Sequence, residues 1–569
     1  IASMSDMSAS NGGTFQADVT FAAGADIITA TAGTDNVRIG SGAGDSIASG
    51  GNDNVTIGKN AGTAITTGDS NVAIGHEALA AQTTAGNNTV VGNNAASSNV
   101  TGTDITAIGY QALEDATSGQ YNTALGARAA ANLTSGDFNT AIGRDTLSGV
   151  VTGDGNVAVG NASLAANTSG ASNVAVGRNA LVANTTGGSS IAIGKDALKT
   201  LTTASEMVAI GTEALQANTS GTQNVAIGTG SMYDNTTGGY NTAVGHNTLP
   251  NNTTAGYNVA VGLNSLAANT TGQENTAVGQ GTLTANTTAH ANTAMGSAAM
   301  SSSTTASYNT AVGAASLAAQ TTGTDNTAIG YAVLDVCTTG YGNCGVGGGA
   351  TYQASALGSI TTGYHNTAVG SGAMASISGA NFCTSVGRLS GYTATGSNST
   401  FIGESAGYLM TTGNSNTILG RFNGNQYSMD IRTGDNYIVI SDGAGEPKAH
   451  QGGTYGWYQK NNSASWSTTS DRRIKENITD LESGLETITA LRPVEFDYKI
   501  KEKQHDIGFI AQEYETVLPD QVHTEASAAS DIRELTDGED VKVISPNLVP
   551  YLVKAVQELS AKNDALEAR

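Results

Sequence analysis

The sequence predicts a mostly β protein: a trimeric β-solenoid of 17-residue repeats, a β neck, and a small α+β C-terminal domain that ends in a coiled-coil helix. Three observations support this. Glycine closes a short apolar motif at a fixed 17-residue interval over most of the chain. Five of the six prolines lie at residue 447 or beyond, where the composition changes. Apolar residues near the C-terminus recur every seven positions. The predicted parts are an N-terminal β segment (1–35), the repeat array (36–420), the neck (421–469) and the C-terminal domain (470–569).

Composition limits the functions that this chain can have. Charged residues make up 12% of the 569 residues, against about 25% in an average protein. The net charge of -23 leaves no basic face for phosphates, so no nucleic-acid partner is expected. The sequence contains no run of about 18 apolar residues, so no membrane insertion is expected. The three cysteines match no zinc spacing, so neither metal nor cofactor is expected. Buried free thiols are favoured over an intermolecular bridge for Cys337, Cys344 and Cys383.

The repeat unit contains the motif Asn-x-Ala-[Ile/Val/Leu]-Gly, as in Asn122 to Gly126. Its closing glycines recur every 17 residues from Gly58 to Gly347 without an insertion. Beyond that point the pattern continues with looser spacing, at Gly370, Gly387, Gly403 and Gly420. A period of 17 is too short for two packed helices and suits one coil of a solenoid.

Within a unit, the apolar motif predicts a first strand and its glycine a turn. A second apolar group, such as Ala78-Leu79, predicts a second strand, and a polar Asn-Thr-Thr-Gly segment closes the coil. We therefore expect two strands and two turns per coil. Stacking identical coils places each motif asparagine above the last, so that the side-chain amides form a ladder.

Small side chains give such a coil a thin core, because each buried methylene contributes only about 0.8 kcal/mol. A single chain would then be marginally stable. Three chains packed along a common axis would bury a further apolar face, which we expect at the Ala/Leu positions. The sequence therefore predicts a homotrimer, in which the strict array is on the order of 80 Å long at about 4.8 Å per coil.

These repeats resemble the β-roll heads of trimeric autotransporter adhesins, and more closely the Asn-Thr-Ala-Val-Gly arrays of phage tail fibres. The resemblance extends from Asn36 to Gly420. It implies a fibre on the virion tail that contacts a host receptor, a glycan or a surface protein, and that meets other tail proteins at its N-terminus.

The neck begins with a change in composition. Tyr437 to Gly443 is typical of a strand that runs into a turn. Aromatic residues then gather at Tyr455, Trp457, Tyr458 and Trp466, and they include tryptophan, which the repeats lack. They are expected to pack a small core, and the alternative is that they bind a host sugar.

The C-terminal domain alternates helices and strands. A helical pattern starts at Ile478 and stops at Arg492-Pro493. Strands are expected at Val494 to Ile500 and from Ile507, the latter entering a helix that ends by Pro519. The final helix begins near residue 547 and carries an a/d heptad pattern with one asparagine, formed by Val549, Leu552, Val556, Leu559, Asn563 and Leu566. Packing of this stripe on its own domain is the alternative.

Residues Ser470 to Ile478, the run Gly508 to Glu513 and the closing helix together resemble the intramolecular chaperone domain of endosialidase tailspikes and many phage fibres. The resemblance implies that three chains assemble through this domain, which then cuts itself off between Thr469 and Ser470. It also implies that Ser470 and Lys475 are catalytic, and that the shared motif includes Asp471, Arg473, Gly508, Phe509, Ile510, Ala511, Gln512 and Glu513.

The chemistry is reasonable in its own right, since a serine can attack its preceding carbonyl if a neutral lysine removes its proton. Without the resemblance, Ser470 and the charges after it would be interpreted as a helix N-cap. Surface roles are expected for His505 and His523.

The expected function is therefore a structural trimeric fibre with a single-turnover, self-cleaving assembly domain. A bacterial trimeric surface adhesin is the alternative. A depolymerising enzyme is not expected, because the repeats contain few of the paired carboxylates that glycoside hydrolysis requires.

Overall fold

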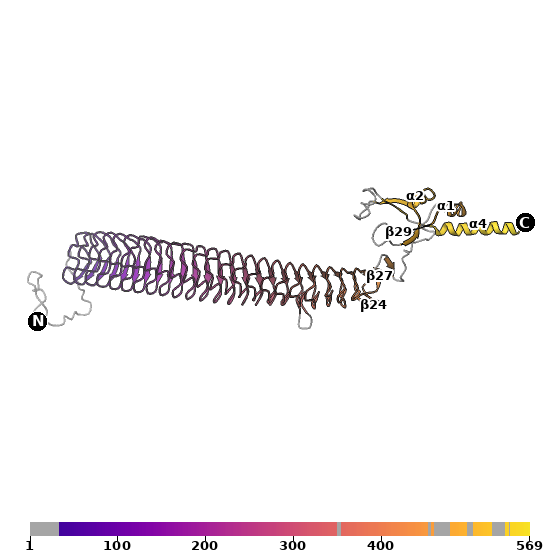
Figure 1. The fold of residues 1–569 in the computed structure, drawn as a ribbon. Coiled ribbons are helices and arrows are strands. Elements are labelled where there is room, and N and C mark those ends of the chain that lie inside the picture. Colours follow the sequence, from indigo (N-terminus) through magenta and orange to yellow (C-terminus); the bar gives the residue numbers. More distant parts are fainter. Residues whose placement is uncertain are drawn as a thin grey trace, which may run out of the picture. The chain divides into compact units, whose positions relative to one another are not determined.

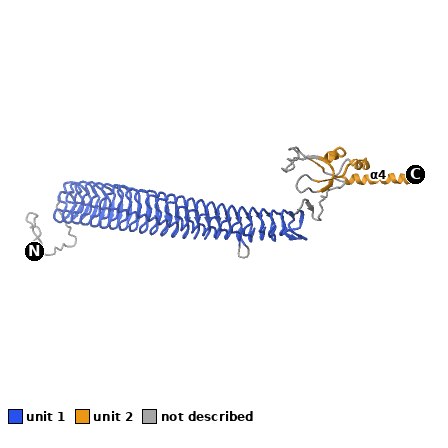
Figure 2. Ribbon diagram, in the orientation of Figure 1, with its two compact units in different colours: residues 1–466 blue, residues 467–569 orange. Residues whose placement is uncertain are grey.

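The computed structural model describes residues 33–349, 354–452, 457–459, 478–497, 505–525, 541–544 and 547–568. The expected N-terminal β segment lies almost wholly outside these residues. The chain divides into two compact units, Ile1–Trp466 and Ser467–Arg569, shown in blue and orange in Figure 2. Each unit is described by itself.

The first unit is a β-solenoid in which each coil contributes one three-residue strand to a parallel sheet (Figure 1). The strands are β1 Val37–Ile39, β2 Val55–Ile57, β3 Val72–Ile74, β4 Thr89–Val91, β5 Thr106–Ile108, β6 Thr123–Leu125, β7 Thr140–Ile142, β8 Val157–Val159, β9 Val174–Val176, β10 Ile191–Ile193, β11 Val208–Ile210, β12 Val225–Ile227, β13 Thr242–Val244, β14 Val259–Val261, β15 Thr276–Val278, β16 Thr293–Met295, β17 Thr310–Val312, β18 Thr327–Ile329, β19 Cys344–Val346, β20 Thr367–Val369, β21 Thr384–Val386, β22 Thr400–Ile402 and β23 Thr417–Leu419.

The register of this sheet confirms the 17-residue period. From the pair β2–β3 to the pair β18–β19, neighbouring strands are parallel, and each residue pairs with the residue 17 positions further on, as Ala226 does with Ala243. The spacing loosens where the sequence indicated, since Cys344 pairs with Thr367 and Thr384 with Thr400. The hydrogen bonds of the sheet therefore run from coil to coil along the solenoid.

The expected second strand of each coil is absent from the described coils. Its Ala/Leu segment turns instead, because alternate residues adopt left-handed backbone, with φ of 54° at Glu77 and 52° at Leu79. These residues still bond to neighbouring coils: the amide of Glu77 donates to Lys59 O at 2.9 Å, and that of Leu79 to Ala95 O at 3.0 Å. An apolar pair followed by polar residues indicates burial, but it does not distinguish a strand from such a turn.

Each coil closes round its own core. The middle alanine of the strand and the leucine of the second apolar group are fully buried in a single chain, as Ala243 and Leu249 are. The expectation that neighbouring chains would cover the Ala/Leu positions is therefore wrong. The apolar positions left outside are the first and third residues of each strand, such as Thr242 and Val244, which are only partly buried.

The asparagine ladder is confirmed. Asn241 is fully buried, and its Nδ2 donates to Asn224 Oδ1 at 3.2 Å and to Ala255 O at 2.9 Å. Its Oδ1 accepts the backbone amide of Asn258 at 3.0 Å. The Asn241 amide therefore bonds to polar groups of three successive coils, as a buried amide requires.

The solenoid ends in a small antiparallel region. Strand β26 (Ile438–Ser441) continues the parallel sheet beside β23, and β27 (Pro447–Gln451) and β28 (Trp457–Gln459) follow it antiparallel. A short hairpin, β24 (Asn425–Gln426) and β25 (Met429–Asp430), precedes them. Large side chains replace alanine in the last coils, where Phe401 and Phe422 are fully buried.

The second unit contains helices α1 (Leu485–Ala490), α2 (Ala511–Tyr514) and α4 (Val549–Glu567) and the 3-10 turn η4 (Pro519–Gln521). Two antiparallel hairpins accompany them: β29 (Val494–Asp497) with β30 (His505–Gly508), and β31 (Val522–Glu525) with β32 (Val541–Ile544). The predicted elements occur in the predicted order, and the hairpin of β31 and β32 is an addition that the sequence analysis missed. Helix α1 begins at Leu485, later than the expected Ile478, and α2 has only four residues.

Candidate functional site in the C-terminal domain

The core of the second unit forms around Tyr514, which is buried together with Leu491 and Leu518. The Tyr514 hydroxyl donates to Gln521 Oε1 at 2.9 Å. The amide of Asn547 donates to the same oxygen at 2.8 Å. One glutamine side chain therefore links α2 to the residues that lead into α4.

The predicted Gly508–Glu513 motif packs directly on this core. Gly508 ends β30 opposite Val494, and the ring of Phe509 lies edge-on to Tyr514 at 5.3 Å between centroids. Ile510 precedes α2, which contains the other three residues of the motif. The motif therefore positions α2 against the end of α1.

An ion pair closes this arrangement. Arg492 Nε lies 2.9 Å from Glu513 Oε2, and the second guanidinium nitrogen contacts the other carboxylate oxygen. The hydrogen bond to Arg492 holds the pKa of Glu513 below its usual value. Both residues border a cavity of about 170 Å³ together with Phe509 and Leu491. Sequence analysis gave Arg492 only the role of ending a helix.

Helix α4 has two different faces. One face packs on the domain: Ala555 is buried, and a side chain on Gly484 of the α1 segment would collide with the Ala555 amide nitrogen. An adjoining face exposes the heptad residues Val549 (70%), Leu552 (46%), Val556 (65%), Leu559 (57%) and Leu566 (69%). The alternative in which this stripe packs on its own domain does not agree with these exposures.

A carboxylate of α4 caps α1. Glu558 accepts hydrogen bonds from the amides of Leu485 at 2.9 Å and Gly484 at 3.2 Å. These two bonds, that of Leu485 first, lower the pKa of Glu558. An anion is favourable here because the first amides of a helix have no partner within it. No sequence signal identifies this cap, because Glu558 lies 73 residues after Leu485 and 74 residues after Gly484.

The predicted catalytic and scissile residues, Thr469, Ser470 and Lys475, lie outside the described residues, as do Asp471 and Arg473. His505 is exposed and lies 3.1 Å from Asp497 Oδ1, which agrees with a surface role. The side chain of His523 is outside the described set.

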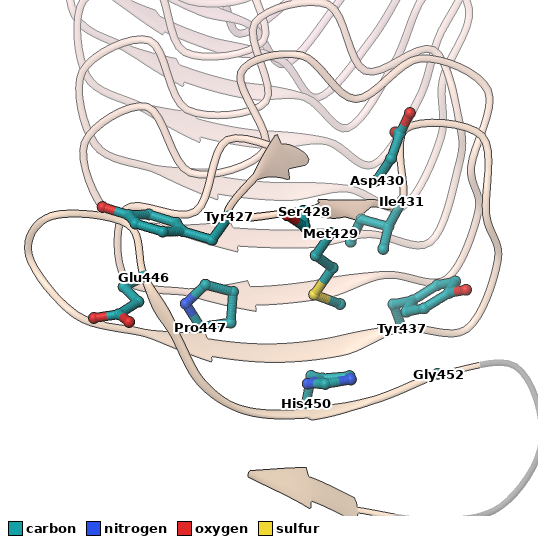
Figure 3. A pocket seen from close by; sticks show the side chains of 10 residues that line it. All are labelled: Tyr427, Ser428, Met429, Asp430, Ile431, Tyr437, Glu446, Pro447, His450 and Gly452. Carbon is teal, nitrogen blue, oxygen red and sulfur yellow. The ribbon is translucent and has the colours of Figure 1, made fainter. Parts of the chain in front are cut away.

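A cavity of about 730 Å³ opens at the end of the solenoid in the first unit (Figure 3). Tyr427 and Tyr437 border it, with Asp430, Glu446 and His450 among the polar residues. Tyr437 packs on the buried cluster of the last coils, whereas Tyr427 is 57% exposed. Burial lowers the pKa of His450. The side chains of Trp457 and Tyr458 are not among those described.

Two kinds of site receive no support from the described residues. They contain no cluster of three or more His, Cys, Asp or Glu side chains that could hold a metal ion. Among the described helices, none combines the length and apolarity that a bilayer-spanning segment requires.

A sequence model of the family described as chaperone of endosialidase matches residues 470–523. The match starts at the predicted nucleophile Ser470 and includes the motif that packs on Tyr514. It covers less than a tenth of the 569 residues, so it assigns a segment of the chain and not the whole. No curated protein and no solved structure matches the chain. The protein thus combines a β-solenoid of 17-residue repeats with a C-terminal domain in which residues 470–523 are similar to the chaperone-of-endosialidase family.

Proposed function

We propose that this chain is the subunit of a homotrimeric phage tail fibre, and that its C-terminal domain assembles three chains and then cuts the bond between Thr469 and Ser470. The observation that carries the proposal is the position of the chaperone match, which begins at Ser470 directly after the solenoid and its end region. Because cleavage at that point removes the domain from the solenoid, each assembly domain would act only once.

The solenoid gives a physical reason for such a domain. Its coils are nearly identical, so two chains packed one coil out of step would lose the contacts of only one coil. The exposed stripe on α4 can bind the same stripe of two further copies, and Asn563 in an a position favours one alignment of identical helices. Aligned C-terminal domains would then fix the stagger of the solenoids.

The proposed cleavage is an acyl shift followed by hydrolysis. Lys475 takes the proton of the Ser470 hydroxyl, whose oxygen attacks the Thr469 carbonyl carbon. The C–N bond to Ser470 breaks as the C–O bond forms, and the departing nitrogen takes a proton to become an amine. Water then hydrolyses the ester and leaves a Thr469 carboxylate. Loss of the aligning domain would make unfolding hard to reverse.

Intact mass under denaturing conditions tests the cleavage. Wild type should give fragments of 469 and 100 residues, counted from the bond after Thr469, whereas Ser470→Ala and Lys475→Ala should remain whole. Ser467→Ala is the matched control, because it removes a hydroxyl three residues away and should cleave normally. Uncut wild type that sediments as a stable trimer would reduce the domain to a permanent trimerisation cap.

Host attachment, through a surface glycan or protein, completes the proposal, together with docking to other tail proteins at the N-terminus. We expect no enzyme activity on other substrates. The repeat architecture supports host attachment, and so does the end cavity, whose lining includes Tyr427 and Tyr437 together with the carboxylates of Asp430 and Glu446. Immunogold labelling of virions separates the tail fibre from the adhesin alternative, in which the label would lie on bacterial cells.

A further inference from the structure

The outer face of the parallel sheet is a continuous uncharged stripe. The first and third residues of each strand lie on this face, and from β2 to β23 the middle residue is buried. In β1–β23 the third residue of each strand is Ile, Val, Leu or Met, and the first residue of each strand is Val, Thr, Ile or Cys. Many of the third residues are well exposed, including Leu125 at 44%, Met295 at 44% and Ile402 at 42%.

This stripe is large enough to form a protein interface. Strands stacked about 4.8 Å apart, each about 10 Å long, give β1–β23 a face on the order of 1,000 Å². A stable interface buries about 800 Å² on each partner. The first residue is threonine in thirteen of these strands, but the third residue is apolar in all of them, so the face has both the area and the apolar row that a covering polypeptide needs.

The edge that precedes the stripe is acidic. We call the second and third residues before each strand the leading edge. In β1–β23 it contains no Lys or Arg and nine carboxylates: Asp35, Asp53, Asp69, Asp104, Asp137, Asp154, Glu206, Glu274 and Asp325. None of the nine forms an ion pair within the described residues; several accept backbone amides of the preceding coil, as Asp137 does from Gln120 at 2.8 Å.

The edge that follows the stripe is the basic one. We call the second and third residues after each strand the trailing edge. Seven of the nine Lys and Arg residues between 36 and 421 lie there: Lys59, Arg128, Arg144, Arg178, Lys195, Arg388 and Arg421. Five carboxylates share this edge and pair with these cations or lie among them: Glu77, Asp145, Asp196, Glu213 and Glu404. The two borders of one apolar face thus differ in charge.

We propose that this stripe is the interface between the solenoids of three copies packed in parallel, with the leading edge of each copy against the trailing edge of the next. The inference rests on the homotrimer proposed above. Rotation about an axis along the solenoid brings unlike edges together, whereas an antiparallel two-fold pair would place acidic edge on acidic edge. Unlike charges at the rim of an interface favour the first arrangement and disfavour the second.

Aligned coils bring complementary residues together. On β2 the leading Asp53 of one copy faces the trailing Lys59 of the next. On β7 and β21 an aromatic ring faces a guanidinium, Phe138 with Arg144 and Phe382 with Arg388, a pairing that cation–π attraction favours.

A slip of one coil keeps some complementarity, because Asp104 then faces Arg128 and Asp154 faces Arg178. The edges therefore select the direction of packing but not its register, which is left to the C-terminal domain.

Thiol accessibility tests the interface in the full-length protein. Ile227→Cys places a thiol on the stripe, where a single chain exposes 36% of the residue, and Thr237→Cys places one on an exposed turn as the matched control. Both are made with Cys344→Ser, which removes the thiol on β19. The remaining Cys337 and Cys383 are buried, which raises the pKa of Cys337 to about 11 and also raises the pKa of Cys383, so both react slowly.

Maleimide should label Thr237→Cys at once and Ile227→Cys at least about 100-fold more slowly, since the second reaction must await local opening. Sedimentation of the same samples gives the mass. A trimer whose Ile227→Cys thiol reacts as fast as the control would overturn the stripe as the interface. A monomer would instead overturn the homotrimer on which the inference rests.

A double substitution tests the direction of packing. Asp53→Cys with Lys59→Cys, oxidised in the native protein, should give covalent trimers, and neither single variant should. The two positions lie on opposite edges of β2, about 10 Å or more apart, beyond the reach of a disulfide within one chain. A second pair, Asp53→Cys with His76→Cys, would cross-link copies that are packed one coil out of step. Protection of Ile227→Cys without covalent trimers from either pair would overturn the edge-to-edge arrangement.

Discussion

Removing one amide from the asparagine ladder should loosen the solenoid locally and strongly. In Asn241→Ala the backbone amide of Asn258 loses its acceptor, which lies 3.0 Å away. The Ala255 carbonyl loses the Nδ2 donor at 2.9 Å but keeps the bond from Asn252 Nδ2 at 3.0 Å. The site is fully buried, so water cannot replace the acceptor of the Asn258 amide without opening the coil. The backbone amide of Asn241 keeps its own bond to Asn224 Oδ1 at 2.9 Å.

A buried polar group left without a partner costs about 1–3 kcal/mol, and this is the expected cost of orphaning the Asn258 amide. Because each coil of a solenoid contacts only its neighbours, this cost falls on the coils beside Asn241. At about 1.4 kcal/mol per factor of ten, local opening should become roughly 5-fold to 150-fold more frequent.

Native-state hydrogen exchange measures this opening directly. Amides in the coils from β12 to β14 should lose protection, while those of β3 and β4 should keep it. Thr237→Ala is the control, since its exposed side chain should contribute no more than about 0.5 kcal/mol. If Asn241→Ala exchanges no faster than Thr237→Ala, the ladder does not stabilise the coil and the reasoning fails.

Two further predictions concern a glycine and a carboxylate. Gly245→Ala should destabilise its coil by more than about 1–2 kcal/mol in thermal melts, because φ is +140° and the new Cβ would lie 2.8 Å from the Gly262 backbone. Gly379→Ala is the control, since its Cβ meets nothing closer than 4.0 Å and the melt should be nearly unchanged. The lowered pKa of Glu558 means that its cap stabilises α1 above the ordinary value of 4.5 and is lost as pH falls through the lower, folded value. Circular dichroism melts should therefore show a smaller acid-induced drop for Glu558→Gln than for wild type, and equal drops would contradict the cap.

The sequence predicts the solenoid well because its period is carried by residues with few alternatives. Gly245 has a φ that L side chains rarely adopt, and a buried asparagine such as Asn241 needs partners at one spacing. The glycine repeats in every coil and the asparagine in most of them, so the 17-residue register and the ladder follow. The order of elements in the C-terminal domain follows from ordinary helix and strand patterns in the same way.

Other features depend on contacts that a linear pattern does not contain. Ala78-Leu79 is equally apolar in a strand or in a left-handed turn, and this led to an extra strand and to the wrong face for chain contacts. Glu558 caps a helix whose first residue is 73 positions away. The charge difference between the two edges appears only once the strands are placed. The roles of Ser470 and Lys475 remain predictions, because both lie outside the described residues.

The direction of the backbone hydrogen bonds has a mechanical consequence. The amides of each coil bond to the next coil along the solenoid, as Val225 does to Asn241 O at 2.9 Å. A pull on the two ends of one chain therefore loads the ladder of the terminal coil first and peels the coils away in turn. Each peeled coil of 17 residues would release roughly 55–60 Å of extended chain. Stretching a single chain should produce a regular sawtooth of force, in which each tooth measures the strength of one coil.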